Sequence, residues 1–170
     1  MPTNQVVPLM TALLVAVFAF QLNASMLAPA LATMESDLNA TTAQIGMTQT
    51  AFFTAAALFS LFMPRWGDLI GRRKVLVGMM VVTVIGSVVA ALATNVTMLF
   101  IGRVIEGAGF LLVTVAAPSL IGEVARRADR DLAFALWSCF MPVGMASAML
   151  AGPLFGDWRA MWWASCALAL

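Results

Sequence analysis

The stretch "PRWGDLIGRRKV", Pro64–Val75, separates two long apolar runs of this chain. It concentrates four of the nine Lys and Arg residues of the sequence, with one acid, Asp68, among them. In membrane proteins, loops on the cytoplasmic side carry an excess of Lys and Arg. The stretch is therefore predicted to be a cytoplasmic loop between two membrane-spanning helices.

Composition supports a membrane protein for the whole chain. Of 170 residues, 62% are hydrophobic and only 10% are charged, whereas a soluble domain is about half apolar and a quarter charged. We therefore predict an all-α integral membrane protein. The net charge of +1 provides no basic field, so no nucleic-acid partner is expected. Histidine is absent, which removes the usual general base and metal ligand, and we predict no enzyme activity, no cofactor and no metal.

Apolar runs divide the chain into six spans within one membrane domain, residues 1–170. A span needs about 20 residues to cross the hydrocarbon core. The sixth run is only about half that long, so we expect an incomplete last helix and hence a fragment or a truncated gene product. The predicted spans are 6–31, 45–63, 75–93, 98–120, 132–155 and 161–170.

The positions of the basic residues predict the orientation. Only Arg159 lies in a loop after an odd-numbered span. The N-terminus and the even loops are therefore predicted to be cytoplasmic, in the inner membrane of a bacterium. Tryptophans at span ends are expected at the membrane interface: Trp66, Trp158, Trp162 and Trp163. The even loops hold the other basic residues outside the spans: Arg65, Arg72, Arg73, Lys74, Arg126, Arg127 and Arg130.

Two short segments recur at the same spacing. "APAL" at Ala28–Leu31 returns as "APSL" at Ala117–Leu120, and "PRWGD" at Pro64–Asp68 returns as "PLFGD" at Pro153–Asp157, each 89 residues later. The second pair is predicted to be a shared helix-exit turn. Because the unit holds three spans, its second copy must be inverted, which predicts a 3+3 inverted-repeat helix bundle of the kind found in secondary transporters.

Motifs at four helix ends resemble those of the major facilitator superfamily, in its N-terminal half. In the loop after span two, Asp68, Gly71, Arg72 and Arg73 match the family pattern, whereas Pro64 and Leu69 depart from it. The fourth span carries "RVIEGAG", with Arg103, Glu106, Gly107 and Gly109. The fifth ends in "GPLFGD", a partial match at Gly152, Pro153 and Gly156 to the signature of proton antiporters, and "DWRAMWW" from Asp157 opens the sixth.

The resemblance implies the N-terminal half of a transporter that works by alternating access with a second half. It also implies that Asp68, Gly71, Arg72 and Arg73 form a cytoplasmic gate motif that contacts that half. For Gly152 and Pro153 it implies a part of the chain that limits leak and favours antiport.

Arg103 and Glu106 are candidates for proton coupling. They lie three positions apart and so share a helix face. An Arg at a helix centre costs ~2.5–3.5 kcal/mol of insertion free energy, which favours a partner or a water-filled cavity. Our hypothesis is that Glu106 carries the proton and Arg103 tunes it. The alternative is that Arg103 extends to the membrane surface and Glu106 only neutralises it.

Polar residues in the first two spans are candidates for a substrate cavity. The alternative, hydrogen bonding between helices, contributes ~0.6 kcal/mol per bond on average, and the sequence favours neither. The candidates are Gln21, Asn23, Ser25, Gln49 and Thr54.

These patterns predict a secondary transporter of a small solute, coupled to protons, whose partners are the bilayer, the solute, protons and a C-terminal half or second chain. One alternative is a half-transporter product that is inactive alone or acts only after pairing with another chain. A membrane-embedded enzyme is the weaker alternative, because no nucleophile and base are paired. The identity of the substrate and the direction of transport do not follow from the sequence.

Overall fold

The computed structural model describes residues 11, 15, 18, 19, 21–124 and 130–169. Every regular element that it assigns in these residues is helical. The helices are α2 (Leu27–Leu38), α3 (Thr42–Ser60), α4 (Met63–Ile70), α5 (Arg72–Ala91), α6 (Val96–Val124), α7 (Arg130–Ser138), α8 (Phe140–Ala151), the 3-10 turn η1 (Gly152–Leu154) and α9 (Trp158–Ala169).

Local sequence explains where several helices begin and end. The Thr41 side chain caps the backbone N–H of Gln44, and the Gln44 side chain returns to Thr41, so α3 starts with a capping box. Asn39 ends α2 in the left-handed conformation, with φ 48°. The segment Arg130–Leu154 is a 25-residue helical run with a hydropathy of 1.6, long and apolar enough to cross a membrane.

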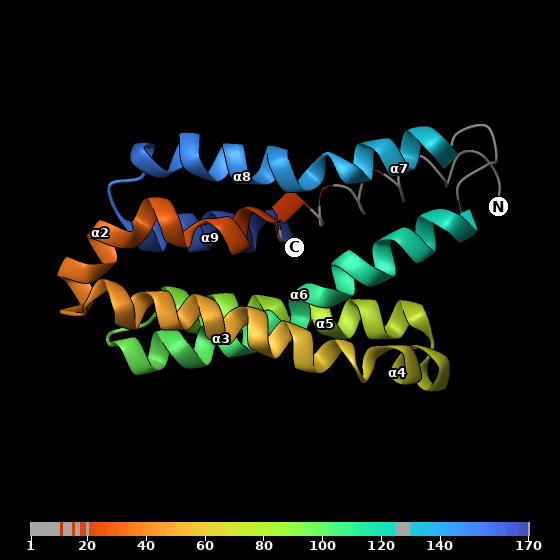
Figure 1. Cartoon of the computed structure of the whole chain (residues 1–170), viewed down its shortest axis with the longest axis horizontal. Coiled ribbons are helices and arrows are strands. Elements are labelled where there is room, and N and C mark those ends of the chain that lie inside the picture. The colour runs from red at the N-terminus through yellow and green to blue at the C-terminus, as the bar shows by residue number, and fades with distance from the viewer. Residues whose placement is uncertain (1–10, 12–14, 16–17, 20, 125–129, 170) are drawn as a thin grey trace.

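Helices of the two sequence repeats pack across each other (Figure 1). The first repeat contributes α2 to α5 and the second contributes α6 to α9. The opening helix of the second repeat, α6, packs against α3 and α5 of the first. Likewise α2 packs against α8, η1 and α9 of the second. This reciprocal exchange of partners is what an inverted repeat produces, and the predicted 3+3 helix bundle is confirmed.

The links after α2, α5 and α8 gather at one end of the bundle, and α4 lies at the other (Figure 1). Arg159 at the start of α9 pairs with Asp37 and donates to the carbonyl of Ala93, 2.8 Å away. Trp158 Nε1 also donates to Asp37 Oδ2, at 3.0 Å. These contacts fasten the α2, α5 and α9 ends to one another.

The prediction of a shared helix-exit turn is wrong. Pro64–Asp68 lies inside α4, and the chain leaves that helix only at Gly71, whose φ is 97°. The matching segment Pro153–Asp157 instead begins in η1 and becomes extended at Phe155. Glycine tolerates a positive φ. The first copy therefore ends its helix at Gly71, and the second copy has no glycine at the matching position.

Two of the tryptophans predicted at span ends are buried against other helices. Trp158 and Trp162 are 2% and 0% exposed and pack edge to face, with ring centroids 5.5 Å apart. Because α9 begins at Trp158, Trp162 lies one turn inside the helix and on the same face. That face points into the bundle.

Candidate functional site

A fully buried ion pair lies at the centre of the bundle. Arg103 Nη1 and Glu106 Oε2 are 2.7 Å apart, and both side chains are 0% exposed. Both residues belong to α6, three positions apart. Arg103 therefore does not extend to the membrane surface, whereas Glu106 does neutralise it, as the alternative also expected.

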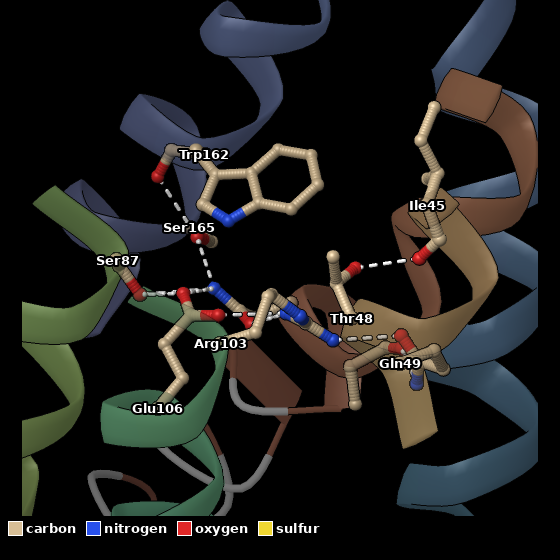
Figure 2. Close-up of polar contacts among 10 residues, drawn as sticks. Ile45, Thr48, Gln49, Ser87, Arg103, Glu106, Trp162 and Ser165 are labelled. Carbon is tan, nitrogen blue, oxygen red and sulfur yellow. Dashed lines mark hydrogen bonds and ion pairs between the residues drawn. The ribbon is translucent and has the colours of Figure 1, made fainter. Parts of the chain in front are cut away.

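Glu106 accepts hydrogen bonds from side chains of two other segments (Figure 2). Ser87 Oγ of α5 donates to Glu106 Oε1 at 2.5 Å, and Asn23 Nδ2 donates to the same oxygen at 2.9 Å. Asn23 Nδ2 also lies 3.0 Å from Ser87 Oγ and 3.2 Å from Ser165 Oγ of α9. The carboxylate thus connects α6 to α5 directly and to α9 through Asn23.

Arg103 extends the network towards α3. Its Nη2 donates to Gln49 Oε1 at 2.8 Å, and its Nη1 donates to Asn23 Oδ1 at 3.1 Å. The guanidinium carbon lies 4.2 Å from the centre of the Phe52 ring and 5.9 Å from that of Trp162. The aromatic faces stabilise the cation where water does not reach it.

Burial makes this network sensitive to its charge state. Taking two charges out of water costs several kcal/mol per ion, which a good ion pair and further hydrogen bonds offset. Protonating Glu106 would remove its charge and turn one acceptor oxygen into a donor. Ser87 and Asn23 both aim donors at that carboxylate, so a proton on Glu106 would weaken the contacts among α5, α6 and the segment that holds Asn23.

Glycines bring α6 close to its neighbours. A Cβ on Gly107 would lie 2.1 Å from the carbonyl oxygen of Phe52, and one on Gly109 would lie 1.8 Å from Thr83 Oγ1. On the facing helix, a Cβ on Gly86 would lie 2.6 Å from the backbone nitrogen of Glu106. The "GAG" that follows Glu106 therefore allows α3 and α5 to approach the ion pair.

The five candidate cavity residues are divided among three places. Asn23 and Gln49 contact the ion pair, whereas Gln21 Nε2 donates to Ser25 Oγ at 3.0 Å, one turn away. Thr54 is exposed and lines a separate, mostly apolar groove of about 460 Å³ between α3 and α6. Five positions separate Thr54 from Gln49, which is roughly 140° around a helix, so the two side chains cannot share a face.

The gate motif lies at the opposite end of the bundle from Asp37 and Arg159. Asp68 is exposed on the last turn of α4. Gly71 joins α4 to α5 with φ 97°, a conformation that a side chain would strain. Arg72 and Arg73 open α5, but their side chains lie outside the described residues.

The three residues of the helix-five signature lie in different environments. A Cβ on Gly152 would lie 2.4 Å from Pro29 Cβ, so this glycine permits close contact between η1 and α2. Pro153 and Gly156 are exposed, and nothing lies within 4 Å of a Cβ built on Gly156. Packing therefore accounts for Gly152 but not for the other two.

Four members of the network were missed by sequence reasoning: Ser87, Ser165, Phe52 and Trp162. A single serine in an apolar span does not indicate a site, because its hydroxyl can donate a hydrogen bond to a backbone carbonyl of its own helix. The charged pair was the feature of the sequence that could have predicted them, because a buried carboxylate needs hydrogen-bond donors from neighbouring spans. Of these residues Ser87 is adjacent to Gly86, whose missing side chain allows α5 to reach α6.

Comparison with known proteins places this geometry in a family. Residues 13–170 match the Major Facilitator Superfamily. The chain belongs to this superfamily. Over 99% of its length it superposes on the proton:xylose symporter XylE bound to 6-bromo-6-deoxy-D-glucose, with a TM-score of 0.84 and 16% sequence identity, covering 43% of that chain.

Sequence relatives in the superfamily are also transporters. The chain is 62% identical over 105 residues to the uridine/deoxyuridine transporter of Lactococcus lactis subsp. cremoris, a match that covers 62% of this chain and 22% of the relative. It is 31% identical over 130 residues to the inner membrane transport protein YajR of Escherichia coli, covering 76% of this chain and 28% of the relative. The chain thus matches less than half the length of each. The superfamily fold that it shares is that of integral membrane transporters.

Proposed function

We propose that this chain forms the N-terminal half of a proton-coupled secondary transporter for a small polar solute. The observation that carries the proposal is the buried Arg103–Glu106 pair, joined by side-chain hydrogen bonds to α3, α5 and the segment around Asn23. Hydrogen bonds offset the cost of burying such a pair, but an intramembrane carboxylate remains expensive to keep, and residues of this kind mark proton and substrate pathways. Alternating access with a second half would move the solute.

Glu106 is the proton carrier in this proposal, and Arg103 is the positioning residue. When Glu106 is charged, it accepts from Ser87 and Asn23 and holds α5 and α6 together. When it takes a proton, Arg103 keeps its bonds to Gln49 and Asn23, but its own countercharge is gone. The change in these contacts would bias the bundle towards the other conformation.

The solute is proposed to be a nucleoside. This class is supported by the 62% identity to the uridine/deoxyuridine transporter, twice that to the relatives named for inositol or xylose, which are 32% identical. Gln21, Ser25 and Thr54 remain candidates for contact with the solute, because their side chains lie outside the hydrogen bonds to the ion pair.

Asp68, Gly71, Arg72 and Arg73 are proposed to form the cytoplasmic gate contact with the second half. Asp68 is exposed at the tip of α4, where a helix N-terminus of another half could approach it. Asp68→Asn in the complete gene product is expected to slow transport and to increase cytoplasmic labelling of a cysteine placed in the cavity. Unchanged transport and labelling would leave the arginines with an anchoring role alone.

Uptake by the complete gene product in proteoliposomes tests the function. Labelled uridine, deoxyuridine and xylose are offered with and without an imposed proton gradient of either direction. Accumulation of the nucleosides that reverses with the gradient is expected, and its sign separates symport from the antiport implied by Gly152 and Pro153. Equal uptake with and without the gradient would contradict proton coupling, and accumulation of xylose alone would contradict the nucleoside class.

A further inference from the structure

A small cavity with a mostly apolar wall and four polar side chains lies beside the ion pair, on the side away from α3. It lies between α5, α9 and the segment that holds Asn23, is partly open, and leaves about 10 Å³ for the centre of a water molecule. That is about the space that one water requires. Its lining residues are Ala19, Asn23, Thr83, Val84, Ser87, Ser165 and Cys166.

The hydroxyl groups around this cavity have acceptor capacity left over. Ser87 Oγ donates its one hydrogen to Glu106 and accepts from Asn23, which leaves one lone pair. Thr83 Oγ1 donates to the carbonyl of Met79 at 3.0 Å, and Ser165 Oγ donates to that of Trp162 at 2.9 Å. Each hydroxyl can still accept a hydrogen bond. A water needs two to four polar partners, and this lining supplies them.

We infer that the cavity is a one-water site that delivers the proton to Glu106 through Ser87. The inference rests on the proposed proton coupling and names the route by which the proton arrives. Glu106 itself does not line the cavity, whereas Ser87 does and also touches the carboxylate. Ser87 is therefore the link between them.

The transfer balances without any other reactant. An excess proton that reaches the cavity water passes to Ser87 Oγ as the Ser87 hydroxyl releases its own hydrogen to Glu106 Oε1. The water and the serine end as they began, and the carboxylate becomes a carboxylic acid. The 2.5 Å separation of Ser87 Oγ and Glu106 Oε1 is that of a strong, charge-assisted hydrogen bond, which suits transfer of the proton.

Two variants of the complete gene product test the route in proteoliposomes with labelled uridine. Ser87→Ala removes the relay hydroxyl, and Ala19→Val fills the cavity, because Ala19 is 2% exposed and lines it. Each is expected to lower proton-driven net uptake roughly tenfold or more. Exchange of labelled for unlabelled uridine at equal pH, which needs no net proton transfer, should fall much less than net uptake and so report a folded carrier.

Thr48→Val is the matched control. Thr48 is equally buried, but its hydroxyl donates to the carbonyl of Ile45 at 2.7 Å, and it does not line the cavity. This variant should leave both net uptake and exchange unchanged.

Three results would overturn the inference: unchanged net uptake in Ser87→Ala, equal loss of net uptake and exchange in both variants, or the same selective loss in Thr48→Val. In these cases a proton-dependent wild type would leave the proposed function standing. Proton-independent uptake by the wild type would overturn the inference and the proposed coupling together.

Discussion

The bundle contains two ion pairs that join the same kinds of groups in opposite surroundings. Arg103 and Glu106 are both 0% exposed and belong to one helix. Asp37 and Arg159 are 44% and 28% exposed and join α2 of the first repeat to α9 of the second. The exposed pair therefore connects the two repeats directly, whereas the buried pair does so only through the neutral side chains that solvate it.

The two pairs therefore differ in how much the loss of one charge costs. An exposed pair is surrounded by water and its loss is tolerated. A buried pair cannot lose one charge without leaving the other uncompensated, so a proton on Glu106 would leave the Arg103 cation without its counter-ion. The predictions below address this contrast, beginning with the largest expected effect.

Removing one member of the buried pair should destabilise the bundle most. Glu106→Leu leaves Arg103 buried without its counter-ion, and we expect the free energy of unfolding to fall by about 3–5 kcal/mol. The double variant Arg103→Met/Glu106→Leu should recover most of this loss, because no buried charge remains. Reversible unfolding in mixed detergent micelles measures both. A double variant less stable than Glu106→Leu alone would show that the uncompensated Arg103 charge is not the cause of the loss.

Disturbing the close packing of α3 on α6 should cause the next largest loss of stability. In Gly107→Ala the new Cβ would meet the Phe52 carbonyl oxygen at 2.1 Å, so the two helices must separate, at a cost of about 1–3 kcal/mol. Gly78→Ala is the control, because nothing lies within 4 Å of its Cβ. That variant should be neutral or slightly stabilising. Equal effects of the two substitutions in the same unfolding assay would show that the approach of α3 is not tight.

Removing the exposed Asp37–Arg159 pair should cause the smallest loss of stability, and this loss should depend on pH. Hydrogen bonding from Arg159, and then from Trp158, lowers the pKa of Asp37 below its ordinary value of 3.8. A lowered pKa in the folded state adds stability above the unfolded pKa, and this contribution is lost as the pH falls through the folded value. The melting temperature should therefore decline below about pH 4 in the wild type, and the decline should be smaller in Asp37→Asn. Identical curves for the two proteins from pH 6 to pH 3 would contradict this assignment.

Most of the fold follows from the sequence. Long apolar runs indicate which segments span the membrane, and basic loops indicate on which side each span ends. The repeat at Pro64 and Pro153 predicts the inverted arrangement, although its local conformation differs, since only the first copy has Gly71 to end its helix. Arg103 and Glu106 are identifiable because charges in an apolar span are rare. Ser87 and Ser165 are not, because their role depends on which helices approach α6. Thr54 lies in the same span as Gln49, but at 100° per residue the two side chains lie on different faces of the helix.

Proton-driven uptake in Glu106→Gln tests the central claim most directly. The substitution keeps the size of the side chain, replaces one accepting oxygen by an NH2 donor as protonation would, and removes the group that can take up or release a proton. In proteoliposomes containing the complete gene product, we predict the loss of gradient-driven net uptake of uridine, while exchange at equal pH continues. Gradient-driven accumulation equal to that of the wild type would contradict the assignment of Glu106 as the proton carrier.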